Sequence, residues 1–115
     1  MRCTATVRHT GNVAIIDFVG RIMQPDGPEA VRGAIKAEVA QGRKNLLLNL
    51  SEVDFIDSSG LGAMAESYIT IGKLGGVLKL LKPQSRVASM LEVANLYSCF
   101  VTFNNESEAL ASFAR

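Results

Sequence analysis

The chain has 115 residues, of which 48% are hydrophobic and 20% are charged, and its formal net charge is +1. This length and balance predict a single domain, residues 1–115, with one core of ordinary size. Because there is no block of basic residues, nothing in the charge favours binding to nucleic acid or to an anionic membrane surface.

Targeting and metal signals are also absent from the sequence. No window reaches the roughly 18 apolar residues of a membrane span, and the first residues lack the apolar run of a signal peptide. Cys3 and Cys99 are too few and too far apart for a disulfide framework or a zinc site. We therefore expect a cytoplasmic protein that does not insert into a membrane and holds no metal.

The first half of the chain reads as a hairpin, a loop and a helix. Alternating apolar and polar residues predict an edge strand over Cys3–Arg8. After a turn, Val13–Val19 predicts a more buried strand that pairs with the first. Gly20–Gly27 is rich in helix breakers and is expected to be a loop, with Asp26 capping the next helix. That helix is expected to end near Gly42.

A continuous apolar run, Leu46–Leu50, predicts the central strand. The chain then turns at 57–60, and apolar residues recur every three or four positions as far as Lys73, which predicts a helix. Four further elements are expected: a strand over Val77–Leu81, a helix from Pro83, a strand over Phe100–Phe103 and a helix capped by Asn105. This order indicates an α/β domain with about four α-helices and a mixed sheet of four to five strands. The hairpin should form an antiparallel edge, and the later strands should be parallel.

The turn at 57–60 places two hydroxyls and a carboxylate at the start of a helix. Ser58 or Ser59 is suited to the N-cap position, and the free N–H groups of a helix start attract anions. A cap needs one side-chain oxygen, so two adjacent hydroxyls are more than one cap requires. Gly60 and Gly62 have no side chains, which leaves the surface around the serines open. The residues leave two interpretations open, a plain cap and a serine that is modified or contacted by a partner.

Catalytic patterns are missing. A serine nucleophile needs a neighbouring base, and the only histidine, His9, falls in a predicted turn far along the chain from Ser58. Asp54 and Asp57 lack a His or Glu to complete a site, so turn and capping roles suit them better. Neither a nucleophile elbow nor a phosphate-binding loop is present. We predict that the chain is not an enzyme and carries no cofactor.

The segment FIDSSGLGAM, preceded by NLLLNLSEVD and followed by LGGVLKLLKPQSRVASMLEVANL, resembles the STAS domain. More narrowly, it resembles the single-domain bacterial anti-sigma factor antagonists. The resemblance covers nearly the whole chain, and the DSSGLG core with a downstream GG-x-L-x-L strand is a fairly specific signature. In that family the serine directly after the aspartate is phosphorylated. The matching position is Ser58, with Ser59 as the alternative.

The resemblance implies a function in partner switching. The unphosphorylated antagonist binds an anti-sigma factor and frees a sigma factor, and so regulates transcription. That anti-sigma factor is itself a serine kinase of the histidine-kinase-like ATPase class, and its kinase activity ends the complex. A serine phosphatase resets the cycle. ATP and magnesium would belong to the kinase and not to this chain.

The docking surface is expected to include the turn, the outward side of the following helix and the loop after the second strand. Its residues are Asp57, Ser58, Ser59, Gly60, Leu61, Gly62, Ala63, Glu66, Ser67, Thr70, Arg21 and Met23. Arg21 and Met23 stand where many antagonists carry carboxylates. This departure leaves the expected fold unchanged and bears on whether the partner is a standard anti-sigma kinase.

Two other functions remain open. In a STAS accessory subunit of a lipid (ABC) transporter, the domain is a scaffold that need not be phosphorylated, and Ser58 is a simple cap. In a nucleotide-binding STAS domain, a phosphate loop would be needed, and the sequence shows none. The oligomeric state is also open, because the edge strand could pair with a second chain.

Overall fold

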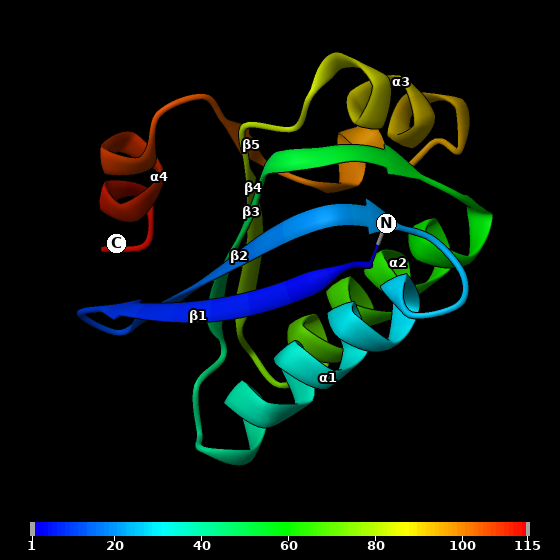
Figure 1. Cartoon of the computed structure of the whole chain (residues 1–115). Coiled ribbons are helices and arrows are strands. Elements are labelled where there is room, and N and C mark those ends of the chain that lie inside the picture. The colour runs from blue at the N-terminus through cyan, green and yellow to red at the C-terminus, as the bar shows by residue number, and fades with distance from the viewer. Residues whose placement is uncertain (1, 115) are drawn as a thin grey trace.

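A computed structural model describes residues 2–114 of the chain. Within these residues, five strands form one sheet in the order β1-β2-β3-β4-β5 (Figure 1). The antiparallel pair is β1 with β2, and the remaining neighbours are parallel. The strands are β1 (Thr4–Thr10), β2 (Val13–Ile22), β3 (Asn45–Ile56), β4 (Val77–Leu81) and β5 (Thr102–Phe103). The helices are α1 (Gly27–Ala40), α2 (Ser58–Lys73), α3 (Ser85–Val93) and α4 (Glu106–Ser112), with a 3-10 turn, η1 (Tyr97–Cys99). The predicted mixed sheet is confirmed.

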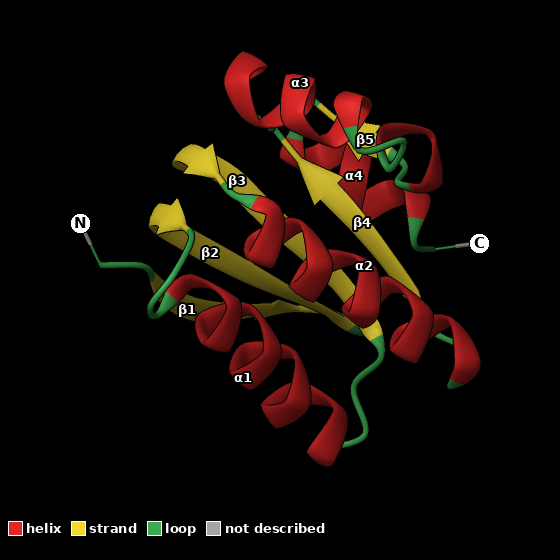
Figure 2. Cartoon of the chain, turned by 90° about the vertical axis from the view of Figure 1, so that its right-hand side faces the viewer, coloured by secondary structure: helices red, strands yellow, loops and turns green. Residues whose placement is uncertain are grey.

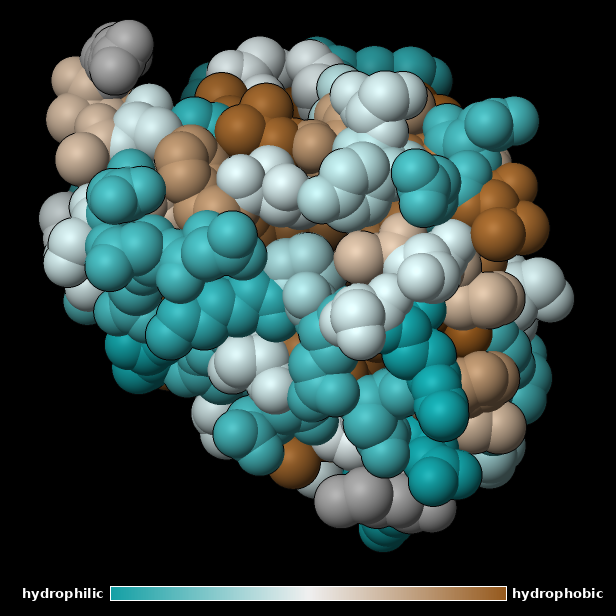
Figure 3. Space-filling view, turned by 90° about the horizontal axis from the view of Figure 1, so that it is seen from above, coloured by the Kyte–Doolittle hydropathy of each residue, from teal (hydrophilic) through white to brown (hydrophobic). Residues whose placement is uncertain are grey.

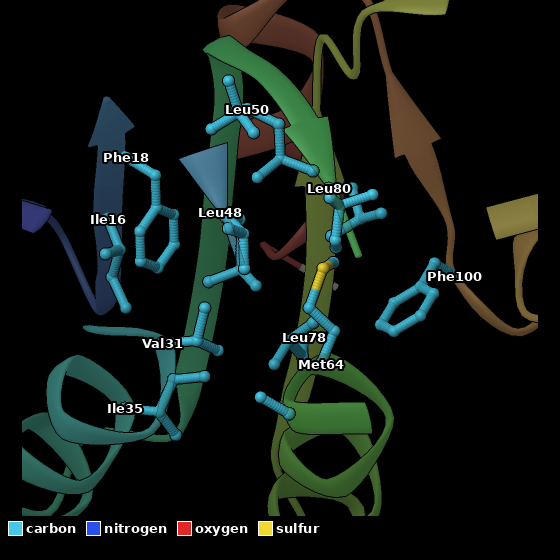
Figure 4. Close-up of a cluster of buried hydrophobic side chains, with 14 of the residues drawn as sticks. Ile16, Phe18, Val31, Ile35, Leu48, Leu50, Met64, Leu78, Leu80 and Phe100 are labelled. Atoms are coloured by element: carbon cyan, nitrogen blue, oxygen red, sulfur yellow. The ribbon is translucent and has the colours of Figure 1, made fainter. Parts of the chain in front are cut away.

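Helices cover both faces of the sheet. The first three helices lie on one face and α4 lies on the other (Figures 1 and 2). Phe18, Leu48 and Met64 belong to the larger core beneath the first three helices (Figure 4). Leu47 and Phe113 belong to a smaller core beneath α4. Because β3 is buried on both faces, it reads in the sequence as a continuous apolar run.

The two central strands are longer than the sequence predicted. β3 extends well beyond Leu46–Leu50, and β2 takes in the first residues of the predicted loop Gly20–Gly27. The reason is that the ends of the two strands pair with each other, with Ile22 opposite Ile56. Both strands therefore end beside the turn that begins α2.

Two polar residues have roles that the sequence did not indicate. Asp26 occupies the N-cap position of α1 but makes no capping bond. Its Oδ2 accepts a hydrogen bond from the backbone N–H of Cys3 instead, at 3.1 Å. His9 lies in β1 and not in a turn, and its Nε2 is 2.8 Å from Oε1 of the buried Glu38.

In the last third of the chain, the structure differs from the prediction only in where its elements begin and end. α3 begins at Ser85 and not at Pro83, and the last strand is the two-residue β5 where Phe100–Phe103 was expected. Asn105 caps α4 as predicted, because its side-chain oxygen accepts a backbone N–H. Seen from above, hydrophobic residues lie in separate groups among hydrophilic ones (Figure 3). None of the described helices has the length and apolar character needed to cross a membrane.

Candidate functional site

Close backbone packing fixes the turn between β3 and α2. The N–H of Asp57 donates to the Ile22 carbonyl at 3.2 Å. A Cβ on Gly60 would overlap that same carbonyl oxygen, and a Cβ on Gly27 would lie 2.6 Å from the Ile22 carbonyl carbon. The starts of α1 and α2 therefore both pack against the last residue of β2, in a space that only glycine fits.

The N-cap of α2 is Asp57, so the predicted capping role of Ser58 or Ser59 is wrong. The Asp57 Oδ1 accepts from the Gly60 N–H at 2.8 Å and from the Ser59 hydroxyl at 2.6 Å. Its Oδ2 accepts from the Gln24 N–H at 3.2 Å. One carboxylate thus caps the helix and also holds the loop after β2, through three accepted hydrogen bonds on two oxygens. A serine hydroxyl offers a single oxygen with two acceptor lone pairs. The serines become the first two helical residues.

The charge of Asp57 is stabilised by the same bonds. Burial alone would raise the pKa of Asp57, but the hydrogen bonds from Ser59, Gly60 and Gln24 outweigh it and lower that pKa. The carboxylate is therefore ionised at neutral pH. A fixed negative charge lies directly before Ser58 in the chain.

The two serines differ in accessibility. Ser58 is exposed, and its hydroxyl makes no hydrogen bond within residues 2–114. Ser59 is half-buried, and its hydroxyl is bonded to Asp57. Of the two hydroxyls, that of Ser58 is the one open to a modifying enzyme.

The predicted outward face of α2 is only partly correct. Gly62, Glu66 and Thr70 are exposed as expected. Ala63 is fully buried and Ser67 is 5% exposed, so their predicted outward position is wrong. The cause is that α2 packs against α1 as well as against the sheet (Figure 2). The Ser67 hydroxyl donates to the Ala63 carbonyl within the helix.

Some of the remaining predicted site residues are buried and shape the turn, and the others lie at least partly at the surface. Gly60 and Leu61 are buried, so they shape the turn without offering side chains to a partner. Arg21 is exposed, with its Nε 3.4 Å from the Asp54 carboxylate. Met23 is half-buried in the loop after β2. The bond from Gln24 to Asp57 places that loop against the turn, as expected.

Sequence reasoning missed one contributor, Gln24, which contacts Asp57 through its backbone, for which no side-chain signal exists. The apolar spacing leaves Ile69 between the core face and the outward face of α2, open to an interface or a core-edge role, and its side chain is 55% exposed. In residues 2–114 no group of three or more His, Cys, Asp or Glu side chains is placed to hold a metal ion.

Comparison with known proteins identifies the family. Residues 4–109 match the model of the STAS domain. The chain belongs to the STAS domain family. A protein of Thermotoga neapolitana, named as a candidate anti-sigma factor antagonist, is 34% identical to it over 70 residues, 61% of this chain. The matched segment spans 62% of that relative.

Solved structures of other proteins share the fold. A candidate anti-sigma factor antagonist from Thermotoga maritima superposes with a TM-score of 0.89 at 23% identity, covering 96% of this chain and 95% of the other. An antagonist from Mycobacterium paratuberculosis gives 0.85 at 26% identity, covering 98% and 95%. The phosphorylated form of Bacillus SpoIIAA gives 0.73 at 21% identity, covering 95% and 98%.

The Asp57 carboxylate is expected to stabilise this STAS domain in a pH-dependent way. Asp57→Ala removes the cap and the bond to Gln24, which should lower the free energy of unfolding by about 1–3 kcal/mol at pH 7. Because the pKa of Asp57 is lower in the folded state than its ordinary 3.8, this contribution is present above pH 3.8 and is lost as the pH falls further.

Urea unfolding of wild type and Asp57→Ala at pH 7 and near pH 3 measures this. The difference in free energy of unfolding between the two proteins should be smaller at the lower pH. A gap that stays constant would show that the carboxylate charge is not what stabilises the turn.

Proposed function

We propose that this chain is a cytoplasmic anti-sigma factor antagonist, a binding module that is switched by phosphorylation of Ser58. The observation that carries the proposal is the state of Ser58: it is exposed, it makes no hydrogen bond with any residue that the structure describes, and it lies next to the ionised Asp57 at the start of α2. The relative from Thermotoga neapolitana and the solved antagonist from Mycobacterium paratuberculosis support the same role.

The proposed docking surface is the accessible part of the site. It comprises Asp57, Ser58, Ser59, Gly62, Glu66, Thr70, Arg21 and Met23. In its unphosphorylated form this surface binds an anti-sigma factor and so frees a sigma factor. The partner is a serine kinase of the histidine-kinase-like ATPase class, which brings its own ATP and magnesium.

Phosphorylation acts through charge at this surface. A phosphate on Ser58 adds about −1.5 to −2 charges and three strong acceptors. The N–H groups at the start of α2 tolerate an anion, so the fold is retained. Inside an interface the same charge lies beside Asp57 and has no counter-ion, which makes the complex unfavourable. A serine phosphatase then restores the binding form.

Mass spectrometry of the intact protein tests this proposal. The chain is incubated with ATP, magnesium and each candidate anti-sigma kinase of the same genome, beside Ser58→Ala and Ser59→Ala. We expect one added phosphate in wild type and in Ser59→Ala, and none in Ser58→Ala. Loss of the phosphate only in Ser59→Ala would move the site to Ser59. No phosphate with any kinase, together with stable binding to a transporter ATPase, would overturn the proposal in favour of a scaffold role.

A further inference from the structure

A groove of about 270 Å³ lies at the end of α2 that is far from Ser58. One wall is α2, through Tyr68, Ile69 and Gly72. The others are β4, the end of η1 and the segment that follows it. This groove contains none of the residues of the proposed docking surface. It therefore calls for a separate explanation.

The groove concentrates exposed apolar side chains. Eight large hydrophobic residues are exposed within residues 2–114, and four of them line this one groove. They are Tyr68 (40% exposed), Ile69 (55%), Val77 (41%) and Val101 (54%). Exposed apolar residues scattered singly need no explanation, but a group that lines a hollow marks an interaction site.

The groove also runs along an uncovered flank of the sheet. The two-residue β5 pairs with β4 only at Leu80 and Leu81. In the described part of the chain, the outer side of β4 at Val77 and Leu78 therefore has no neighbouring strand. An unpaired strand flank is a template for an extended peptide, whose backbone can add to the sheet.

Gly72 leaves the groove open on its α2 side. A Cβ at this position would meet no atom within 4 Å, and the φ of Gly72 is not positive. Glycine within a helix is unfavourable relative to alanine. Since the fold requires neither the space nor the flexibility, the missing side chain is consistent with contact by a partner.

A line of residues along one side of α2, small except for Ile69, joins this groove to Ser58. Ser58, Gly62, Ala65, Ile69 and Gly72 follow one another at spacings of four and three, so they share one side of α2. All are exposed except Ala65, which is half-buried. At a rise of 1.5 Å per residue, this line from Ser58 to Gly72 is about 21 Å long. One partner can therefore contact both ends.

The charges around the groove indicate the chemistry of its occupant. Among the described residues that line it none is acidic, and the one charged residue, Lys79, donates to the Ser112 hydroxyl. Lys73 follows Gly72 at the end of α2, and it forms no ion pair among the described residues. A carboxylate on the partner would complement this cation.

We infer that the groove anchors an extended apolar segment of the anti-sigma factor, which lies along the free flank of β4 with a carboxylate toward Lys73. The inference rests on the proposed function, and it extends the docking surface along α2. The apolar anchor supplies affinity in both phosphorylation states, and Ser58 at the other end supplies the switch.

The thiol of Cys99 reports directly on this groove. Cys99 is exposed and lines the groove, whereas Cys3 is buried. In a Cys3→Ser background, the rate of reaction with Ellman's reagent is measured with and without the full-length anti-sigma factor that the chain binds. A saturating partner should slow the reaction of Cys99 at least ten-fold.

Matched variants distinguish the loss of a contact with the partner from a general loss of stability. Ile69→Ser and Gly72→Gln should each weaken binding roughly 10- to 100-fold, as for residues at the centre of an interface. Val93→Ser changes a residue that is 79% exposed outside the groove, and Gly33→Gln adds a side chain to another helical glycine with open space around it. Both controls should bind within two-fold of wild type.

The outcomes are distinct. If Ser58→Glu abolishes binding while Cys99 stays reactive and Ile69→Ser binds normally, the anchor is overturned and the proposed function stands. If Cys99 is protected without a partner in a concentration-dependent manner, a second copy of the chain fills the groove and the inference fails. If no anti-sigma factor binds, the inference and the proposed function fall together.

Discussion

Ser58→Glu is expected to weaken binding to the anti-sigma factor at least 100-fold, whereas Ser58→Ala should stay within about three-fold of wild type. A factor of 100 corresponds to about 2.7 kcal/mol, which a single uncompensated charge buried in an interface can supply. The hydroxyl of Ser58 makes no hydrogen bond in the described chain, so neither substitution removes a contact that stabilises the fold. Both variants should unfold within about 0.5 kcal/mol of wild type.

Titration calorimetry with one anti-sigma factor measures the effect. The same experiment on the phosphorylated protein should show a larger loss, because phosphate carries up to about two charges where glutamate carries one. Ser58→Ala is the control, since it changes the same side chain without adding a charge. Wild-type affinity for Ser58→Glu would show that the start of α2 lies outside the interface.

Gly60→Ala is expected to lower the free energy of unfolding by about 2–3 kcal/mol. The new Cβ would overlap the backbone carbonyl oxygen of Ile22 and approach the side chain of Ile56 to 2.8 Å. Because a backbone carbonyl in a paired strand cannot rotate away, the start of α2 must shift from the end of β2.

Gly62→Ala is the matched control for this effect. It lies two residues further along the same helix, and its Cβ would meet no atom within 4 Å. Alanine should therefore raise the free energy of unfolding there by about 0.5–1 kcal/mol. Urea denaturation followed by circular dichroism compares the two. Equal effects of both substitutions would contradict the close approach at Gly60.

The sequence predicted the bounds of some elements well because the apolar periodicity and the positions of the glycines indicated the same boundaries. The helix ending at Lys73 and the strand Val77–Leu81 have the predicted bounds. β3 was predicted too short, because polar residues such as Ser51 and Asp54 follow the apolar run. They belong to the strand because the extended β2 pairs with it as far as Ile56.

The turn at the start of α2 was located by its motif, but its internal contacts were not. Asp57 rather than a serine caps the helix, because one carboxylate can accept from the helix and from the loop after β2 together. Ala63 and Ser67 were placed outward because small and polar residues carry little hydrophobic signal. Only the position of α1 shows that they are buried.

The order of the sheet has a consequence for how the molecule is made. Each strand from β2 onward pairs with the strand that precedes it in the chain, so none has to insert between two others. A chain leaving the ribosome can therefore add strands to an existing edge in the order of synthesis. The pairing of β2 with β3 and the helix that begins at Ser58 both precede β4, β5 and α4. The segment that carries the proposed switch can thus take its place on the sheet while the last third of the chain is still being translated.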